Sequence, residues 1–341
     1  MKRLLLLTTV LLFTGMTVQA KTPDQLRAEF IDLMVDRHGF SRDEVTRTLY
    51  KAQLRRPILE AIARPAEKTL NWTEYRAIFL KPSRIDGGVS FWRRHADTLA
   101  RAEREYGVPP HIIVAILGVE TRYGAITGKY RVLDALHTLG FHYPRRGKFF
   151  REQLNHFLRF SREEKIDPVV PTGSYAGAMG MPQFMPDSFR VYAVDYDGDG
   201  RRDIWDNPQD VIGSVANYFV KKGNWKRGQP VTVPAGGANA SHQGLVEAGA
   251  KPRLKPAELA AAGIDTSDVP QDAAVSLIEF HTDDGQEYWI GMDNFYAIMR
   301  YNPRTMYAMA VFQLGEAIRE RYEHTVARTP VTANVAGPSN D

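Results

Sequence analysis

The sequence contains no cysteine among its 341 residues. Disulfides, thiolate metal sites, iron–sulfur clusters and a cysteine nucleophile are therefore excluded. The excess of positive over negative charge is also small. The 44 basic residues nearly balance the 40 acidic ones, and the formal net charge is +4. No dense run of lysine and arginine provides the electrostatic footprint of a nucleic-acid-binding protein. The 27 glycines and 20 prolines are too few for a collagen-like or low-complexity chain.

An apolar run stands at the start of the chain. Lys2 and Arg3 precede an apolar run over residues 4–13, and small residues follow up to Ala20. This order predicts a secretory signal peptide over residues 1–20 and hence an exported, periplasmic protein. The run is too short to span a bilayer, and no cysteine follows it to carry an acyl chain, so no stable membrane anchor is expected.

Helical periodicity dominates the chain after the apolar run. Apolar residues recur at intervals of three and four over 24–34, and Ser41 followed by Glu44 has the form of a capping box. A further helix over 89–106 is predicted to end at Gly107. The fold class is therefore expected to be mainly α.

The segment from 226 to 292 differs in composition from its neighbours. Proline, glycine and alanine are dense in it, and strand-like sequences over 275–280 and 287–290 flank Asp284-Gly285. This pattern predicts a β-hairpin, and with it a small β insertion in a helical protein. Helical periodicity then returns over 305–322.

The sharpest local motif is an acidic loop over residues 195–206. Carboxylates stand at loop positions one, three, five, nine and twelve, with glycine at position six: Asp195, Asp197, Asp199, Asp203, Asp206 and Gly200. This spacing places oxygen atoms round one point, as a hard cation such as calcium requires. Aspartate at position twelve departs from the usual bidentate glutamate. The alternative is an acidic solvated turn, and a lone loop favours a structural ion over a signalling one.

A second motif is the apolar segment 112–124, which contains a single carboxylate. In a helix, Ile113, Ile116, Leu117 and Glu120 share one face. An acid on an apolar stripe loses hydration, which raises its pKa and suits a general acid near neutral pH. The local pattern leaves a second interpretation open, in which Glu120 pairs with a basic residue such as Arg122 or emerges at the helix end.

A third motif is the glycine-rich segment 173–186, which contains Ser174, Tyr175 and Gln183. Residues that permit close backbone approach often line a cleft for a polar ligand. No Gly-x-Ser-x-Gly elbow is present, so a serine nucleophile is poorly supported. A plain surface loop is the alternative, although the methionines and the phenylalanine of this segment are too apolar for comfortable exposure.

Taken together, these motifs resemble the lytic murein transglycosylase B family, glycoside hydrolase family 103. The segments that carry the resemblance are 119–124, 144–150, 173–186, 195–206, 216–219 and 307–311. The resemblance implies a lysozyme-like core flanked by a helical domain and a small β domain, and cleavage of the MurNAc–GlcNAc bond of peptidoglycan to a 1,6-anhydro-MurNAc end. The implied boundaries are a helical domain over 21–85, a core over 86–225, a β domain over 226–292, return helices over 293–326 and a disordered tail over 327–341.

The resemblance also implies roles for individual residues. Glu120 matches the catalytic acid/base, and Ser174 and Gln183 match positions that hold the sugar at the cleavage point. The tyrosines that match cleft-lining positions are Tyr75, Tyr218, Tyr301 and Tyr307. The implied ligands of one EF-hand-like structural calcium are Asp195, Asp197, Asp199, the carbonyl of Arg201, Asp203 and Asp206. No organic cofactor is expected, and the expected partner is the peptidoglycan glycan strand.

The number of carboxylates in the motifs is consistent with this reaction. Glycosidases usually use two carboxylates, and the motifs supply one outside the metal loop. A single carboxylate suffices if the substrate supplies its own nucleophile, so a lyase is favoured. The alternatives are a lysozyme-type hydrolase on the same fold and a non-catalytic, calcium-stabilised wall-binding protein, against which Glu120 on an apolar stripe argues.

Overall fold

The computed structural model describes residues 21–64 and 70–327, and its internal contacts divide the chain into two compact units. The units are Met1–Arg47 and Thr48–Asp341. The predicted signal peptide over 1–20 and the predicted tail beyond residue 327 lie outside the described residues.

The first unit contains α1 (Pro23–His38) and most of α2 (Arg42–Lys51). Thr22 and Gln25 form a capping box at the start of α1, and Gly39 ends the helix at φ 63°. The backbone N–H of Glu44 donates to the Ser41 hydroxyl over 3.1 Å. The capping contact predicted at the start of α2 is therefore present.

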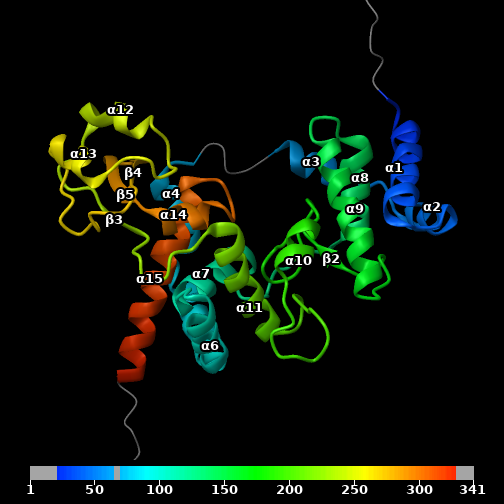
Figure 1. Cartoon of the computed structure of the whole chain (residues 1–341), viewed down its shortest axis with the longest axis horizontal. Coiled ribbons are helices and arrows are strands. Elements are labelled where there is room, and N and C mark those ends of the chain that lie inside the picture. Colours follow the sequence, from blue (N-terminus) through cyan, green and yellow to red (C-terminus); the bar gives the residue numbers. More distant parts are fainter. Residues whose placement is uncertain (1–20, 65–69, 328–341) are drawn as a thin grey trace, which may run out of the picture. The chain divides into compact units, whose positions relative to one another are not determined.

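The second unit is built mainly of helices (Figure 1). The predicted helix over 89–106 is two helices that meet at His95, and it ends as predicted at Gly107, whose φ is 73°. The elements of this unit are α3 (Arg56–Ala63), α4 (Trp72–Phe79), α5 (Pro82–Arg94), α6 (Ala96–Tyr106), α7 (Pro110–Thr121), α8 (Val132–His142), α9 (Gly147–Glu163), α10 (Pro186–Tyr192), α11 (Pro208–Tyr218), the π-helix η2 (Phe219–Gly223), the 3₁₀ helix η3 (Ala240–His242), α12 (Gln243–Val246), α13 (Pro256–Ala261), α14 (Asp293–Met299) and α15 (Thr305–Ala327).

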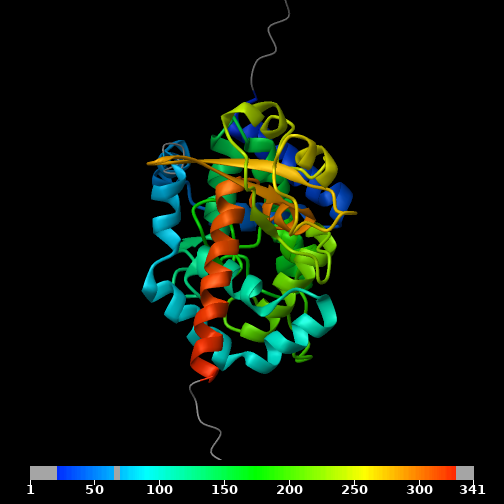
Figure 2. The same ribbon diagram turned by 90° about the vertical axis from the view of Figure 1, so that its left-hand side faces the viewer.

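Helix α7 is the centre of this unit. Its residues from Ile112 to Leu117 are fully buried, so the helix is apolar on all sides rather than on one stripe. It packs against α5, α6, α11 and α15. Helix α15, the long red helix of Figure 2, also contacts α4, α5 and α14. These neighbours enclose the helix that carries Glu120.

The predicted hairpin is confirmed, with its turn displaced by one residue. Strands β4 (Ser276–Thr282) and β5 (Gly285–Gly291) are antiparallel, and β3 (Thr232–Pro234) pairs with the other edge of β5. Thr282 pairs with Gly285, so the turn is Asp283-Asp284 instead of Asp284-Gly285. Gly285 has φ 136°, a conformation that favours glycine at the first position of the returning strand.

A second, two-stranded sheet was not predicted from the sequence. Strand β1 (Tyr130–Arg131) pairs with β2 (Thr172–Gly173), and α8 and α9 lie between them in the chain. Strands of two residues are too short to show an alternating pattern. This small sheet joins the end of α7 to the glycine-rich segment 173–186.

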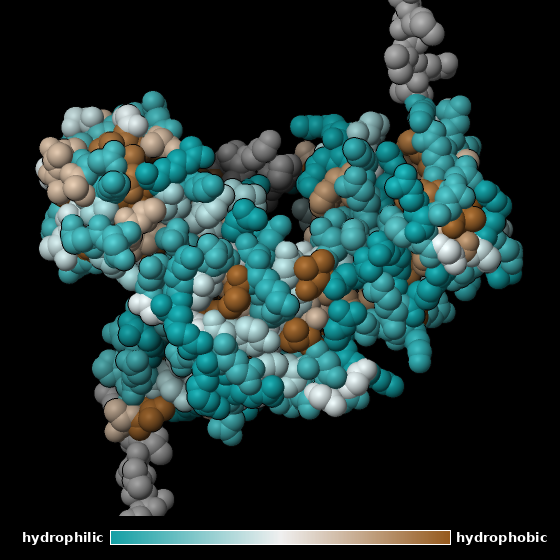
Figure 3. Space-filling model, in the orientation of Figure 1, coloured by the Kyte–Doolittle hydropathy of each residue, from teal (hydrophilic) through white to brown (hydrophobic). Residues whose placement is uncertain are grey.

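Among the described helices, none combines the length and hydropathy that crossing a membrane requires. The face in Figure 3 is mostly hydrophilic, and its hydrophobic residues form separate small patches. Scattered apolar residues of this kind are ordinary on protein surfaces.

Replacing Gly118 by alanine tests the packing of α7. A Cβ at this position would lie 2.6 Å from the Tyr123 hydroxyl oxygen, which already donates to the Arg84 carbonyl over 2.7 Å. We expect Gly118→Ala to lower the unfolding free energy by roughly 1–3 kcal/mol despite the better helix propensity of alanine. Thermal unfolding measures the change.

Gly244→Ala is the matched control, because nothing lies within 4 Å of a Cβ added to that helical glycine. It should stabilise the protein by about 0.5–1 kcal/mol. Equal melting temperatures for the two variants would contradict the packing described for α7.

Candidate functional site

The end of α7 is held in a defined turn. Arg122 and Tyr123 follow the helix at φ 51° and 60°, which is the left-handed region. The Tyr123 hydroxyl donates to the carbonyl of Arg84, and the Arg84 guanidinium donates to the carbonyl of Gly118 over 2.7 Å. A helix often ends at a glycine in the left-handed region, but here these contacts hold Arg122 in that conformation. Glu120 is half-buried and lies in the last turn of the helix.

Glu120 accepts a hydrogen bond from a residue remote in the sequence. The Tyr307 hydroxyl donates to Oε1 of Glu120 over 2.5 Å. Burial, followed by the charge of Glu120, raises the pKa of Tyr307 well above its ordinary value. The phenol therefore stays protonated at any physiological pH and acts as a permanent donor to the carboxylate.

Two more of the predicted tyrosines lie in the electrostatic field of Glu120. The Tyr301 hydroxyl donates to the carbonyl of Pro182 over 2.6 Å, and the Tyr218 hydroxyl donates to that of Arg300 over 2.7 Å. Their ring centroids are 4.8 Å apart. Burial is the main cause that raises the pKa of both phenols, and the negative charge of Glu120 contributes.

The rings of the predicted cleft tyrosines are mostly inside the protein. Tyr75, Tyr307 and Tyr218 are only 2%, 3% and 6% exposed. Tyr75 packs among aromatic neighbours, with ring centroids 6.4 Å from Trp72 and 5.2 Å from Phe79. The structure therefore groups Tyr218, Tyr301 and Tyr307 round Glu120, and contact of any of the four with a sugar stays a prediction.

Ser174 and Gln183 shape the glycine-rich segment. The Ser174 hydroxyl oxygen accepts the backbone N–H of Ala178 over 3.0 Å. The Gln183 side-chain amide donates to the carbonyls of Thr127 and Gly180 over 3.0 and 2.9 Å. Gln183 itself has φ 52°, so its backbone is held in a sparsely populated conformation. Both side chains have a structural task, and their contact with substrate also remains a prediction.

Thr121 connects the glutamate to this segment. Its buried hydroxyl donates to the carbonyl of Met181 over 2.9 Å and accepts the N–H of Gly124 over 3.0 Å. The N–H of Met181 in turn donates to the carbonyl of Ile204 in the acidic loop over 2.8 Å. The residue next to Glu120 is thus linked through one residue, Met181, to the loop predicted to bind metal. Thr121 was not predicted from the sequence, since a threonine at a helix end has no distinctive signal.

The acidic loop is ordered by its own carboxylates. Asp195 accepts the N–H groups of Gly198 and Gly200 over 2.7 and 2.8 Å. Asp203 accepts those of Trp205 and Asp206 over 2.8 and 3.0 Å. These bonds close the turn that the spacing of the aspartates predicted.

The carboxylates that converge most closely differ from the predicted set. Within the described residues, ligand atoms of Asp195, Asp197 and Asp210 lie within 4.8 Å of one another. Asp210 is fully buried in α11 and accepts the N–H groups of Tyr196 and Asp203, and burial raises its pKa. Three carboxylate oxygens so close fit a hard divalent cation. Asp210 was not among the residues predicted from the sequence, because it lies outside the twelve-residue loop motif.

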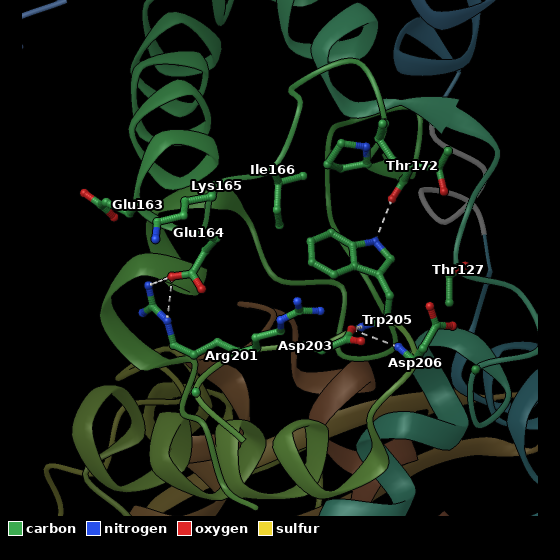
Figure 4. Close-up of a pocket in the computed structure, with 15 residues that line it drawn as sticks. Thr127, Glu163, Glu164, Lys165, Ile166, Thr172, Arg201, Asp203, Trp205 and Asp206 are labelled. Atoms are coloured by element: carbon green, nitrogen blue, oxygen red, sulfur yellow. Dashed lines mark hydrogen bonds and ion pairs between the residues drawn. The ribbon is translucent and has the colours of Figure 1, made fainter. Parts of the chain in front are cut away.

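A cavity of about 880 Å³ lies beside the acidic loop, and Glu120 is not among its lining residues. Figure 4 shows the Trp205 ring within it, with the indole N–H donating to the carbonyl of Thr172 over 3.1 Å. The Arg202 guanidinium pairs there with Glu164. The hydrogen-bonded groups round Glu120 therefore lie outside this cavity.

Comparisons with known proteins identify the family of this chain. The family model described as the transglycosylase SLT domain matches residues 23–316. Membrane-bound lytic murein transglycosylase B of Escherichia coli (strain K12) is 45% identical over 300 residues, which are 85% of this chain and 81% of that protein.

Solved structures agree as well. Soluble lytic transglycosylase SltB1 from Pseudomonas aeruginosa has a TM-score of 0.82 and 51% identity, covering 86% of this chain and 99% of its own. Escherichia coli Slt35 in complex with calcium has a TM-score of 0.78 and 43% identity, covering 87% and 94%.

The architecture defined by these similarities is the lysozyme-like fold of lytic transglycosylases, as the sequence motifs predicted. The chain belongs to the transglycosylase SLT family.

Thr121→Val tests the link between α7 and the glycine-rich segment. Valine has the same shape but leaves the Met181 carbonyl and the Gly124 N–H without their partner, at a cost of about 1–3 kcal/mol for each buried group. Since the Glu120 carboxylate would be displaced, we expect turnover to fall roughly ten- to hundredfold. Thr121→Ser keeps the hydroxyl and should retain both stability and turnover, whereas equal loss in both variants would contradict the role of the hydroxyl.

Proposed function

We propose that this chain is a lytic murein transglycosylase in which Glu120 is the single general acid and base. The observation that carries the proposal is the 2.5 Å hydrogen bond from Tyr307 to Glu120 at the end of the largely buried helix α7 of an SLT-family chain. The substrate is the β-1,4 bond between MurNAc and GlcNAc in peptidoglycan strands. The predicted signal peptide over residues 1–20 fits an exported, periplasmic enzyme.

The Glu120 carboxyl group takes part in two proton transfers: it first gives a proton and then receives another. Protonated Glu120 gives its proton to the glycosidic oxygen as the C1–O bond breaks, and an oxocarbenium-like MurNAc forms. The carboxylate then takes the proton of the C6 hydroxyl while O6 attacks C1, which closes the 1,6-anhydro ring. Water is not consumed, and the starting protonation state of Glu120 is restored.

The surrounding residues support these steps. The Tyr307 phenol donates to the carboxylate that remains after the first proton transfer, which stabilises its charge. Ser174 and Gln183 hold the glycine-rich segment in which we place the sugar at the cleavage point. The tyrosines Tyr75, Tyr218 and Tyr301 complete the wall round the glutamate in this proposal.

Glu120→Gln tests the catalytic assignment. The amide is nearly isosteric but cannot donate and recover a proton, so we expect turnover of purified sacculi to fall at least about a hundredfold. Asp187→Asn is the matched control, because Asp187 is another carboxylate whose charge raises the pKa of Tyr218. It should keep most activity. A large loss in the control would instead indicate a two-carboxylate site.

The product distinguishes the lyase from a lysozyme-type hydrolase. We expect mass spectrometry of the released muropeptides to show anhydro-MurNAc ends, lighter by one water than hydrolysis products. The reason is that the C6 hydroxyl of the substrate, and no external water, serves as the nucleophile. Reducing MurNAc ends alone would assign the protein to the hydrolases.

The proposal includes one structural calcium in the acidic loop. Asp195, Asp197 and Asp210 are the ligands that geometry favours, and the remaining loop oxygens (those of Asp199, Arg201, Asp203 and Asp206) complete the set predicted from the sequence. The calcium-bound relative Slt35 supports this assignment. Such an ion would hold the loop whose Ile204 carbonyl accepts the N–H of Met181 in the glycine-rich segment.

Calcium should raise the melting temperature by several degrees. A ligand selective for the folded state at a hundredfold excess over its Kd stabilises by about 2.7 kcal/mol. Asp197→Asn should remove most of this shift, because it lowers the charge of the site. Scanning calorimetry with calcium and with a chelator measures the change in melting temperature. If calcium raised the melting temperature of the variant as much as that of the wild type, the ligand assignment would be wrong.

A further inference from the structure

A second cavity in the Thr48–Asp341 unit has a lining of unusual charge. Its volume is about 560 Å³, and its walls come from residues 54–57, at the start of α3, and residues 129–131, which include β1. Four of these seven lining residues are basic and none is acidic. The basic residues are Arg55, Arg56, Lys129 and Arg131.

A single buried carboxylate behind the cavity holds two of these cations in place. Asp134 is 1% exposed and receives Arg55 Nε over 3.0 Å and Arg131 over 2.7 Å. In the described part of the chain, Arg56 and Lys129 make no ion pair or hydrogen bond through their side chains. Four cations face one carboxylate, which leaves an excess of three positive charges.

The two arginines are therefore pre-positioned, whereas the other two cations are free to meet a ligand. The Asp134 carboxylate also accepts the N–H of Gln53, so both of its oxygens are committed to the protein. A cavity with surplus fixed positive charge favours an anionic group. Planar guanidinium groups in particular match carboxylates through paired hydrogen bonds.

The cavity lies directly beside the glycine-rich segment. Tyr130 and Arg131 pair with Gly173 and Thr172 in the two-stranded sheet. Next to Lys129, a Cβ on Gly128 would lie 2.1 Å from the carbonyl carbon of Gly173, so the two backbones are in contact there. The basic cavity thus begins within one or two residues of Ser174, where the proposed function places the sugar.

We propose that this cavity binds the carboxylates of the peptide that the MurNAc residue carries. The proposal rests on the proposed function, because it takes the sugar at Ser174 as its starting point. In a peptide-bearing strand the lactyl carboxyl group of MurNAc forms the amide bond to the peptide, so the sugars are neutral. The carboxylates of the attached peptide are then the anionic groups of the substrate. Leu54 and Pro57 give the same cavity an apolar side that suits the small side chains of such a peptide.

The test compares a double variant on two substrates. Arg56→Gln with Lys129→Gln removes two cations that make no ion pair within the protein. One substrate is the glycan strand with its peptides. The other is the strand stripped of peptides by an amidase, with the lactyl carboxyl groups that this exposes converted to amides, so that it carries no carboxylate. We expect KM for the peptide-bearing strands to rise about tenfold, as for the loss of two charge-assisted contacts, with kcat changed less than about twofold. KM for the stripped strands should stay the same.

Lys251→Gln with Arg253→Gln is the matched control, because it removes one lysine and one arginine from exposed positions in the β insertion. It should leave KM for both substrates unchanged. An equal rise in KM for both substrates in the Arg56/Lys129 variant, or no rise for the peptide-bearing one, would overturn the proposal. Amidation of the peptide carboxylates should weaken binding to the wild type and abolish the difference between the two double variants; an unchanged KM would also overturn it.

The outcome is separable from that of the proposed function. Anhydro ends from the wild type test the reaction, whereas the KM ratio of the two substrates tests the cavity. Equilibrium binding of both glycans to the same proteins gives the second comparison without turnover. The two substrates therefore test the cavity proposal independently of the product, even if that product is a reducing sugar.

Discussion

The structure of the site depends on the buried hydroxyl of Thr121. This group joins the end of α7 to the carbonyl of Met181, whose own N–H reaches the carbonyl of Ile204. A helix end, a glycine-rich loop and an acidic loop thereby share one continuous set of hydrogen bonds. Because a buried polar group left unpaired is costly, each of the three segments restricts the others to one arrangement.

The electrostatics round Glu120 follow from where the helices meet. Helix α15 brings the Tyr307 hydroxyl to the carboxylate, and burial keeps that phenol protonated. The hydroxyl groups of Tyr218 and Tyr301 donate hydrogen bonds to backbone carbonyls. A carboxylate in such surroundings has a fixed hydrogen-bond donor, which suits the proton transfers proposed for Glu120.

Groups of opposite charge adjoin different residues of the glycine-rich segment. The acidic loop that contains Asp195 and Asp197 contacts it through Ile204, and the basic cavity with Arg56 and Lys129 contacts it through Gly128. The first arrangement suits a cation that stabilises the loop, and the second suits an anionic part of a substrate. The near-neutral total charge of the chain hides this separation.

Local patterns in the sequence determined much of the fold. The periodicity predicted helices, Gly107 marked the end of one, and the composition of 226–292 predicted a hairpin, because these features depend on neighbours in the chain. The motifs likewise identified the family and singled out Glu120 and the acidic loop. They could not place the turn at Asp283-Asp284, since strand register depends on pairing across the sheet.

Only the tertiary structure decided which distant residues complete the site. Tyr307 meets Glu120 across 187 positions of sequence, and Asp210 joins Asp195 and Asp197 from the next helix. Thr121 and the cations of the basic cavity are ordinary residues in their local sequence. Their significance comes from hydrogen bonds and charges brought together by packing of α7, α8, α11 and α15, and such contacts leave no periodic trace in the chain.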